Sequence, residues 1–122
     1  MEKQKLLLID DDPVIVAIYR DHFRATGFDV AVASDGAQGL AAMRDYQPDV
    51  VLLDLNMPNV DGIEWLKAVR NTAMRRVPVV VLTSAEDDKP KLAEDDAVYV
   101  MRKDIAEPWL VVEAVVTAAE TA

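Results

Sequence analysis

Three aspartates follow two strongly apolar runs of the sequence. Asp10 and Asp11 come directly after residues 6–9, and Asp54 comes directly after residues 50–53. Apolar runs of this kind are typical of strands that are buried on both faces of a parallel sheet. The carboxyl ends of such strands form the edge at which open α/β sheets bind their ligands. The sequence therefore predicts a carboxylate cluster at one edge of the sheet.

Two further apolar runs end beside groups that suit the same edge. Residues 79–82 precede Thr83, and residues 98–101 come shortly before Lys103. Carboxylate oxygens are preferred ligands of Mg²⁺, which proteins commonly hold with one or two carboxylates and a phosphate. A hydroxyl and an ammonium group beside such a cluster indicate a site that handles phosphoryl groups.

The predicted chemistry is phosphoryl transfer to a carboxylate. We expect Asp11 and Asp54 to bind Mg²⁺ directly and Asp10 to act through a water. Asp54 ends the central strand, so it is the candidate nucleophile that would form an aspartyl phosphate. Lys103 would pair with the phosphoryl oxygens as a point charge, and Thr83 would donate a hydrogen bond to another of them. Positioning and charge neutralisation suffice for this transfer without a general base.

The elements that would position these groups alternate between strands and helices, which predicts an α/β fold with a parallel sheet. Asp12 is the expected N-cap of the first helix, Pro13 its first residue and Gly27 its C-cap. The other expected elements are a strand at 29–33, an Ala-rich helix ending near Tyr46, a central strand to Asp54, a helix over 63–71, strands at 79–83 and 98–101, and a helix from Pro108.

Composition limits the class of protein. The 122 residues are 52% hydrophobic and 29% charged, which suits one globular domain. No apolar run approaches the roughly 20 residues that span a bilayer, and there is no cysteine for a disulfide or thiolate site. The net charge of −9 argues against nucleic acid binding, which needs clustered Lys and Arg. We expect a cytoplasmic protein without membrane contact.

Several conspicuous residues have simpler structural interpretations. His22 is the sole histidine and is expected to have a surface or packing role rather than to bind a metal. Trp65 and Trp109 are expected in the core or at its margin. Asp61, followed by Gly62, is expected to serve in a turn and helix cap.

Four motifs, in this order, resemble the response regulator receiver domain family of two-component signal transduction. They are residues 9–13, residues 54–58 with Asp61 and Gly62, residues 82–85, and Lys103. The resemblance extends over essentially the whole chain, so residues 1–122 are expected to form a single receiver domain. It implies a flavodoxin-like (CheY-like) three-layer sandwich, with helices on both faces of a five-stranded parallel sheet of order 2-1-3-4-5.

The resemblance also implies how the site works. Asp54 would accept a phosphoryl group from a histidine kinase or a histidine phosphotransfer protein, with Mg²⁺ as cofactor. The backbone carbonyl of Asn56 would complete the metal shell. The protein would not be an enzyme for other substrates, since it would catalyse only its own phosphorylation and dephosphorylation. Phosphorylation would change its binding to a downstream effector protein, and the domain would be a monomer or a weak dimer.

Two departures from the family concern Lys103. Family members usually carry a proline after this lysine, joined by a cis bond, and this chain has Asp104. A non-proline cis bond costs about 2.5–4 kcal/mol, so we expect a trans bond and a differently aimed Lys103. The family's switch aromatic normally occupies the position of Val100, whereas Tyr99 lies one residue earlier and therefore on the opposite face of the strand.

The third departure is a shortened segment between Thr83 and Lys103, which are 20 positions apart. Residues 86–96 include Pro90 and six acidic residues, so the fourth helix is expected to be short, frayed or replaced by a loop. In the family this region commonly docks partners or dimerises. We therefore expect the docking faces on the first and fifth helices.

Two alternatives remain open at the level of sequence. One is a pseudo-receiver, an interaction module that works without phosphorylation, which the altered lysine loop would favour. The other is a Mg²⁺-dependent phosphatase with an aspartyl intermediate. Such enzymes usually place a second acid two residues after the nucleophile, where this chain has Asn56.

Overall fold

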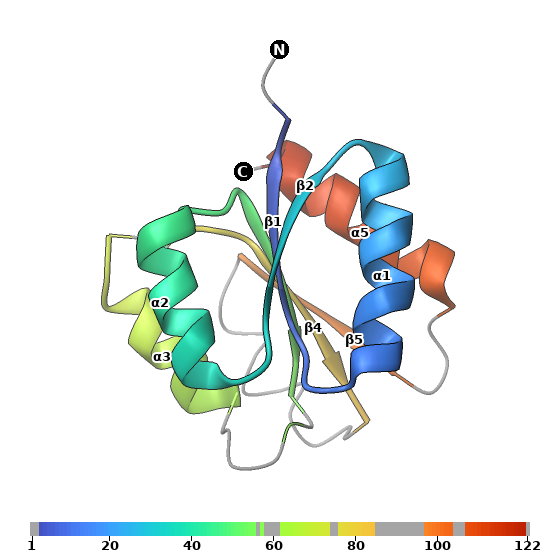
Figure 1. Ribbon diagram of the computed structural model, residues 1–122. Coiled ribbons are helices and arrows are strands. Elements are labelled where there is room, and N and C mark those ends of the chain that lie inside the picture. The colour runs from blue at the N-terminus through green and yellow to red at the C-terminus, as the bar shows by residue number, and fades with distance from the viewer. Residues whose placement is uncertain are drawn as a thin grey trace.

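Five parallel strands form the sheet, in the order β2-β1-β3-β4-β5 (Figure 1). They are β1 (Lys5–Ile9), β2 (Asp29–Ala33), β3 (Val50–Asp54), β4 (Val79–Thr83) and β5 (Val98–Arg102). The computed structural model describes residues 3–55, 57, 62–73, 76–84, 97–103 and 107–121. The observed strand order is the predicted one, and it puts β3 at the centre of the sheet.

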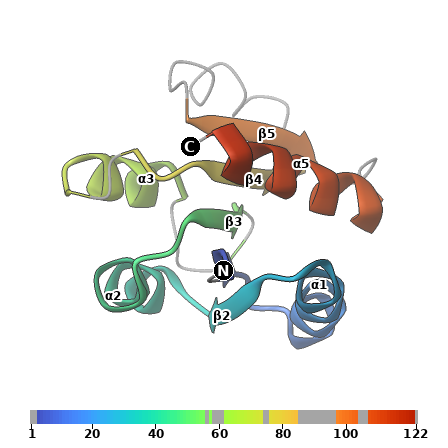
Figure 2. The same ribbon diagram turned by 90° about the horizontal axis from the view of Figure 1, so that it is seen from above.

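Four helices in the described part of the chain cover the sheet, two on each face. They are α1 (Pro13–Thr26), α2 (Gly36–Tyr46), α3 (Gly62–Arg70) and α5 (Pro108–Thr121). Figure 2 shows α1 and α5 on one face and α2 and α3 on the other, which confirms the flavodoxin-like sandwich. The expected short or disordered fourth helix falls on residues 85–96, which lie outside the described residues.

The apolar runs are buried on both faces, as a parallel sheet between helix layers requires. Every residue of β3 and β4 is buried, and successive side chains alternate between two hydrophobic clusters. The α1/α5 cluster contains Leu8 and Leu52, whereas the α2/α3 cluster contains Ile9 and Leu53. The strands therefore leave polar chemistry only to the residues at their ends.

Local signals define α1 as expected. The Asp12 carboxylate accepts hydrogen bonds from the backbone N–H groups of Val14 (2.9 Å) and Ile15 (3.4 Å), so Asp12 is the N-cap. At the other end, Gly27 has a φ of 105° and its N–H donates to the Arg24 carbonyl at 3.1 Å. These two caps fix where the chain leaves and rejoins the sheet.

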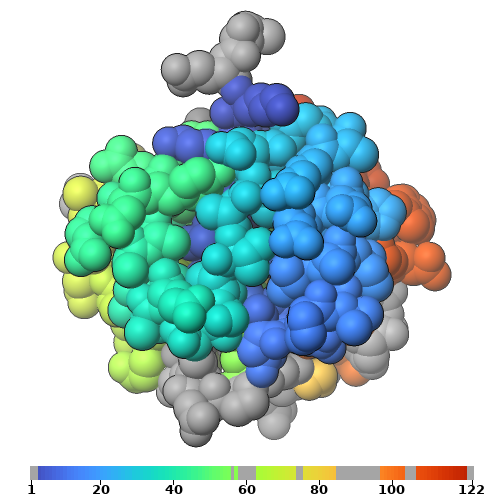
Figure 3. Space-filling view, in the orientation of Figure 1, coloured from blue at the N-terminus to red at the C-terminus, as the bar shows by residue number. Residues whose placement is uncertain are grey.

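Strand β2 is one of the two edge strands of the sheet. The space-filling view in Figure 3 shows α1 and α2 on either side of β2, which is visible between them. Its residue Val32 is 39% exposed. None of the helices in the described part of the chain is long and apolar enough to cross a membrane.

The expectation that Trp109 belongs to the core is wrong, because its side chain is 61% exposed. The buried stripe of α5 is formed by residues at helical spacing, namely Val111, Val115, Ala118 and Ala119. Trp109 lies two positions before Val111, on the opposite side of the helix. Trp65, by contrast, is buried as expected, with 4% exposed.

Replacing Gly27 by alanine should destabilise the fold without changing the acidic edge, the edge of the sheet that carries Asp10, Asp11 and Asp54. Its left-handed φ of 105° is unfavourable for a residue with a Cβ, although nothing lies within 4 Å of the added atom. We expect Gly27→Ala to lower the free energy of unfolding by about 1 kcal/mol in urea denaturation. An unchanged denaturation midpoint would contradict this account of the cap.

Candidate functional site

The register between β1 and β3 brings two aspartates together. Ile9 pairs with Leu53, so the next residues, Asp10 and Asp54, lie side by side at the carboxyl edge and point to the same face. Asp11 follows in the turn toward α1. Carboxylate oxygens of Asp10, Asp11 and Asp54 all lie within 4.8 Å of one another. The predicted carboxylate cluster is therefore present.

The cluster is only partly open to solvent. Asp10 is 2% exposed and Asp54 3% exposed, whereas Asp11 is exposed. The Asp10 carboxylate accepts a hydrogen bond from the Asp12 N–H at 2.9 Å, and its own backbone N–H donates to the Ala33 carbonyl at 3.1 Å. Asp10 is thus held by the ends of two neighbouring strands and by the first turn of α1.

Crowding of the carboxylates disfavours the charged form of Asp10. Burial raises its pKa to about 6, the Asp12 N–H acts in the opposite direction, and the charge of Asp54 adds to the increase. Lys103 lowers this pKa and Asp11 raises it, both to a smaller extent. A cation placed among these oxygens would relieve the repulsion, so the cluster fits a divalent ion with oxygen ligands.

Lys103 places a positive charge beside the carboxylate cluster. Its Nζ lies 2.9 Å from Asp54 Oδ2, across 49 positions of the chain. Burial acts to lower the pKa of Lys103, but the hydrogen bond and the charge of Asp54 outweigh burial and raise it. The Lys103 N–H also donates to the Thr83 carbonyl at 2.9 Å, which anchors the residue to the end of β4.

The expectation that Asp104 would aim Lys103 elsewhere is therefore wrong for the lysine side chain. The backbone hydrogen bond from Lys103 to Thr83 fixes the lysine before the chain reaches position 104. Asp104 itself, and with it the geometry of the bond between the two residues, lies outside the described residues.

Thr83 and the aromatic on β5 occupy the predicted strands. Thr83 is fully buried at the end of β4, one row beyond the pair formed by Asp54 and Leu82. Val100 packs against the α2/α3 cluster, and Tyr99 points to the other face with 37% exposed. As predicted, the aromatic ring of Tyr99 and the side chain of Val100 lie on opposite faces of β5, because neighbouring residues of a strand point in opposite directions.

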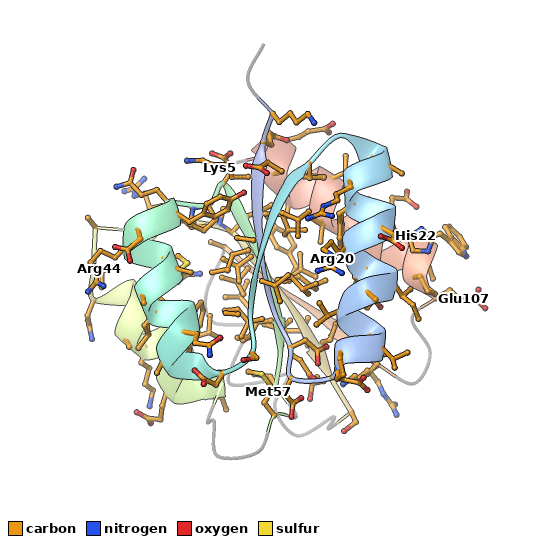
Figure 4. The ribbon with its side chains drawn as sticks, viewed as in Figure 1. Lys5, Arg20, His22, Arg44, Met57 and Glu107 are labelled. Atoms are coloured by element: carbon orange, nitrogen blue, oxygen red, sulfur yellow. The ribbon has the colours of Figure 1, made fainter. Side chains whose placement is uncertain are left out.

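The predicted metal ligand Asn56 and the predicted turn residue Asp61 lie outside the described residues. Met57, between them, is described: it is 5% exposed and belongs to the α2/α3 cluster. Figure 4 shows Met57 at the carboxyl ends of the strands. The segment after Asp54 is thus anchored to the core by at least one side chain.

His22 is exposed and lies on the outer side of α1, away from the acidic cluster, as Figure 4 shows. The expectation of a surface role is confirmed.

Sequence reasoning missed one long-range contact. The indole Nε1 of Trp65 donates to the Gly36 carbonyl at 3.2 Å. The available signal was the pair Gly36 and Gly39, which share one face of an otherwise Ala-rich helix and allow a large side chain to approach.

The raised pKa of Asp10 predicts how stability depends on pH. The folded protein binds the Asp10 proton with a pKa of about 6, compared with 3.8 for the free group, so this aspartate makes stability fall as pH rises between those values. Asp10→Asn removes the charge. We expect a free energy of unfolding at pH 7 that is higher by on the order of 2 kcal/mol, measured in urea without divalent ions.

The difference in the free energy of unfolding between wild type and Asp10→Asn should shrink as the pH is lowered toward 4. A wild type that loses stability relative to the variant on acidification would contradict the assigned shift, because the sign of the linkage would then be reversed.

Removing the amino group of Lys103 should destabilise the protein at neutral pH. Lys103→Ala leaves the buried Asp54 carboxylate beside Asp10 without its counter-charge, at an expected cost of about 1–3 kcal/mol in the free energy of unfolding. Lys67→Ala is the matched control, because Lys67 and Glu64 form an exposed pair at 3.5 Å whose loss should cost about 0.5 kcal/mol or less. Equal effects of both substitutions in urea denaturation would contradict a structural role for the buried pair.

Comparison with known proteins identifies the family. The sequence matches the response regulator receiver domain over residues 6–115. It is 42% identical over 85 residues to the DNA-binding response regulator MtrA of Mycolicibacterium smegmatis, covering 70% of this chain and 36% of that protein. It is 38% identical over 92 residues to the transcriptional regulatory protein KdpE of Mycobacterium tuberculosis, covering 75% and 40%.

Solved structures of response regulators have the same fold as this chain. The chemotaxis response regulator CheY4 of Vibrio cholerae superposes with a TM-score of 0.85 at 26% identity, covering 96% of this chain and 99% of that one. The present chain spans well under half the length of MtrA and KdpE. Sequence, strand order and acidic edge agree: the chain belongs to the response regulator receiver domain family and is a signalling domain of the two-component type.

Proposed function

We propose that Asp54 is the phosphoacceptor of this receiver domain and that Asp10, Asp11, Thr83 and Lys103 assist its phosphorylation. The observation that carries the proposal is the position of Asp54. It ends the central strand, lies within 4.8 Å of two other carboxylates and forms an ion pair with Lys103 at 2.9 Å. A carboxylate in this setting has a cation site on one side and a fixed positive charge on the other.

Mg²⁺ is the proposed cofactor, and the residues fit it. Three carboxylates supply hard oxygen ligands, and a divalent ion would relieve the repulsion from Asp54 and Asp11 that adds to the effect of burial on the pKa of Asp10. Asp11 and Asp54 would bind the ion directly, Asp10 would act through a water, and the Asn56 carbonyl would complete the shell. When bound, the ion would neutralise negative charge on the acceptor and on the phosphoryl oxygens.

The proposed reaction is an in-line displacement at phosphorus. A carboxylate oxygen of Asp54 forms a bond to phosphorus while the bond from phosphorus to the donor nitrogen of a phosphohistidine breaks, which leaves an aspartyl phosphate and a free histidine. The domain would catalyse only this step and the hydrolysis of the aspartyl phosphate, in which water takes the phosphoryl group, inorganic phosphate leaves and the Asp54 carboxylate is restored.

Lys103 and Thr83 would respond to the new phosphate. The phosphoryl group brings three acceptor oxygens and roughly 1.5 to 2 negative charges. Lys103 would transfer its hydrogen bond from Asp54 Oδ2 to a phosphoryl oxygen, and the Thr83 hydroxyl would bind another. Because the backbones of these two residues are hydrogen-bonded to each other, a shift of either one displaces the end of both β4 and β5.

The proposed location of the protein is the cytoplasm, and its proposed partners are a histidine kinase or histidine phosphotransfer protein and a downstream effector protein. Apolar side chains exposed on the helices of the α1/α5 layer support docking there: Val14 is 65% exposed, Ile18 42% and Trp109 61%. We propose that residues 1–122 act as a single receiver domain and as a monomer or weak dimer. No observation in the described residues favours an interaction module that works without phosphorylation.

Asp54→Asn tests the proposal. With Mg²⁺ and acetyl phosphate, the wild-type protein should gain a hydroxylamine-labile phosphoryl group, detected by intact-mass spectrometry and mapped to Asp54. We expect Asp54→Asn to reduce the labelled fraction at least about 100-fold, because an amide is not a nucleophile toward phosphorus. Asp12→Asn is the matched control. It removes a nearby carboxylate but keeps a good N-cap, so labelling should persist.

A labile adduct that survives on Asp54→Asn would assign the acceptor to another residue. A wild-type protein that gains no adduct from acetyl phosphate with Mg²⁺ would favour the module that works without phosphorylation.

A further inference from the structure

Trp65 joins two helices that lead away from opposite parts of the acidic edge. Its buried indole, on α3, donates from Nε1 to the Gly36 carbonyl in the first turn of α2 at 3.2 Å. Figure 1 shows α2 and α3 side by side on the same face of the sheet. The side chain is 4% exposed, so this hydrogen bond is protected from water.

Gly39 makes this approach possible and extends it to β1. A Cβ at position 39 would lie 3.0 Å from Trp65 Nε1 and 2.8 Å from Ile9 Cδ1. Both distances are too short for an unstrained Cβ, and Ile9 is a fully buried side chain with little room to move. Because Gly39 has no side chain, α2, α3 and the end of β1 can pack closely together at this position.

Trp65 lies in the α2/α3 cluster with the residues that immediately precede two of the carboxylates, namely Ile9 and Leu53. Ile9 immediately precedes the metal-binding pair, and the Asp10 N–H is hydrogen-bonded to Ala33, the last residue of β2. From Ala33 the chain runs through the Asp35 N-cap into α2. The α2/α3 cluster also contains Met57, from the segment that follows Asp54. The position of α2 is thus coupled to both halves of the site.

Trp65 contacts α2 at the end of that helix that lies near the acidic edge. Toward their C-termini, α2 and α3 enclose a cavity of about 530 Å³ lined by Leu40, Met43, Val69 and Ala73, among others. The packing of Trp65 against Gly36 and Gly39 therefore sets the distance between the two helices near the acidic edge.

We propose that Trp65 is a positioning residue for the phosphorylation site: it fixes the corner that carries Asp10 and Asp11 relative to Met57, which lies beyond Asp54 in the same cluster as Trp65. This inference rests on the proposed function, because it assigns Trp65 a part in arranging ligands for Mg²⁺. Supporting groups of this kind act on the metal site through the residues they hold in place.

The experiment measures the affinity for Mg²⁺ separately from stability. For each variant, the melting temperature is followed against the concentration of Mg²⁺, and the dissociation constant is obtained from the increase by linkage. We expect Gly39→Ala to raise the dissociation constant for Mg²⁺ about tenfold, at the low end of the effects of outer-shell partners. Trp65→Phe keeps most of the ring, so it should raise the constant less, about threefold.

Each variant has a matched control. Gly27→Ala is the same substitution at the far end of α1, so it should lower the melting temperature without changing the affinity for Mg²⁺. Trp109→Phe replaces the exposed tryptophan and should leave both quantities unchanged. In the Trp109→Phe background, the fluorescence of Trp65 should change on addition of Mg²⁺ with the same dissociation constant.

Failure of this inference differs from failure of the proposed function. If the wild type binds Mg²⁺ but Gly39→Ala and Trp65→Phe bind it equally well, Trp65 has only a structural role and the inference is overturned. If Gly39→Ala does not fold, Trp65→Phe alone decides. A wild type that shows no stabilisation by Mg²⁺ would overturn both the metal site and the positioning role.

Discussion

The pair formed by Lys103 and Asp54 is the interaction on which the acidic edge depends. Asp10 and Asp54 are almost fully buried, and with Asp11 they bring three carboxylates within 4.8 Å. Burying a carboxylate beside like charges is costly, and the pKa of Asp10 is raised mainly by its burial and further by the charge of Asp54. The ammonium group at 2.9 Å from Asp54 offsets part of the repulsion. Under the proposed function, this locally unfavourable arrangement is kept because binding a cation and a phosphoryl group requires it.

The rest of the fold can be understood as the support for this arrangement. A parallel sheet places the carboxyl ends of its strands at one edge, and the register of β1 with β3 makes Asp10 and Asp54 neighbours. The apolar side chains of the same strands fill two separate clusters, one on each face. Burial of these clusters supplies the stability that the crowded carboxylates reduce. Site and core are therefore built from consecutive residues of the same strands.

Two departures from the family's usual pattern have different consequences. The loss of the proline after Lys103 does not displace the lysine, whereas the shift of the aromatic residue to Tyr99 leaves its ring on the other face of β5. Lys103 reaches Asp54 although Asp104 replaces the usual proline, because a backbone hydrogen bond to Thr83 fixes the lysine first. Tyr99 keeps its displaced position, so the face of β5 that carries Val100 has no aromatic ring. A signal passing from Thr83 to β5 would therefore move an aliphatic side chain rather than swing an aromatic one.

Local and periodic features were readable from the sequence alone, since they depend on neighbours in the chain. Apolar runs predicted the strands, and the caps Asp12 and Gly27 delimited α1, because each acts within a few residues. The order of the strands was predicted only by the resemblance to the receiver domain family. The acidic edge could be predicted because the carboxyl ends of parallel strands lie at the same edge of the sheet. The tertiary structure alone decided the contacts between distant segments: Lys103 with Asp54, Trp65 with Gly36 and Gly39, and the exposure of Trp109. Each of these depends on how helices and strands far apart in the chain pack together, which no local pattern specifies.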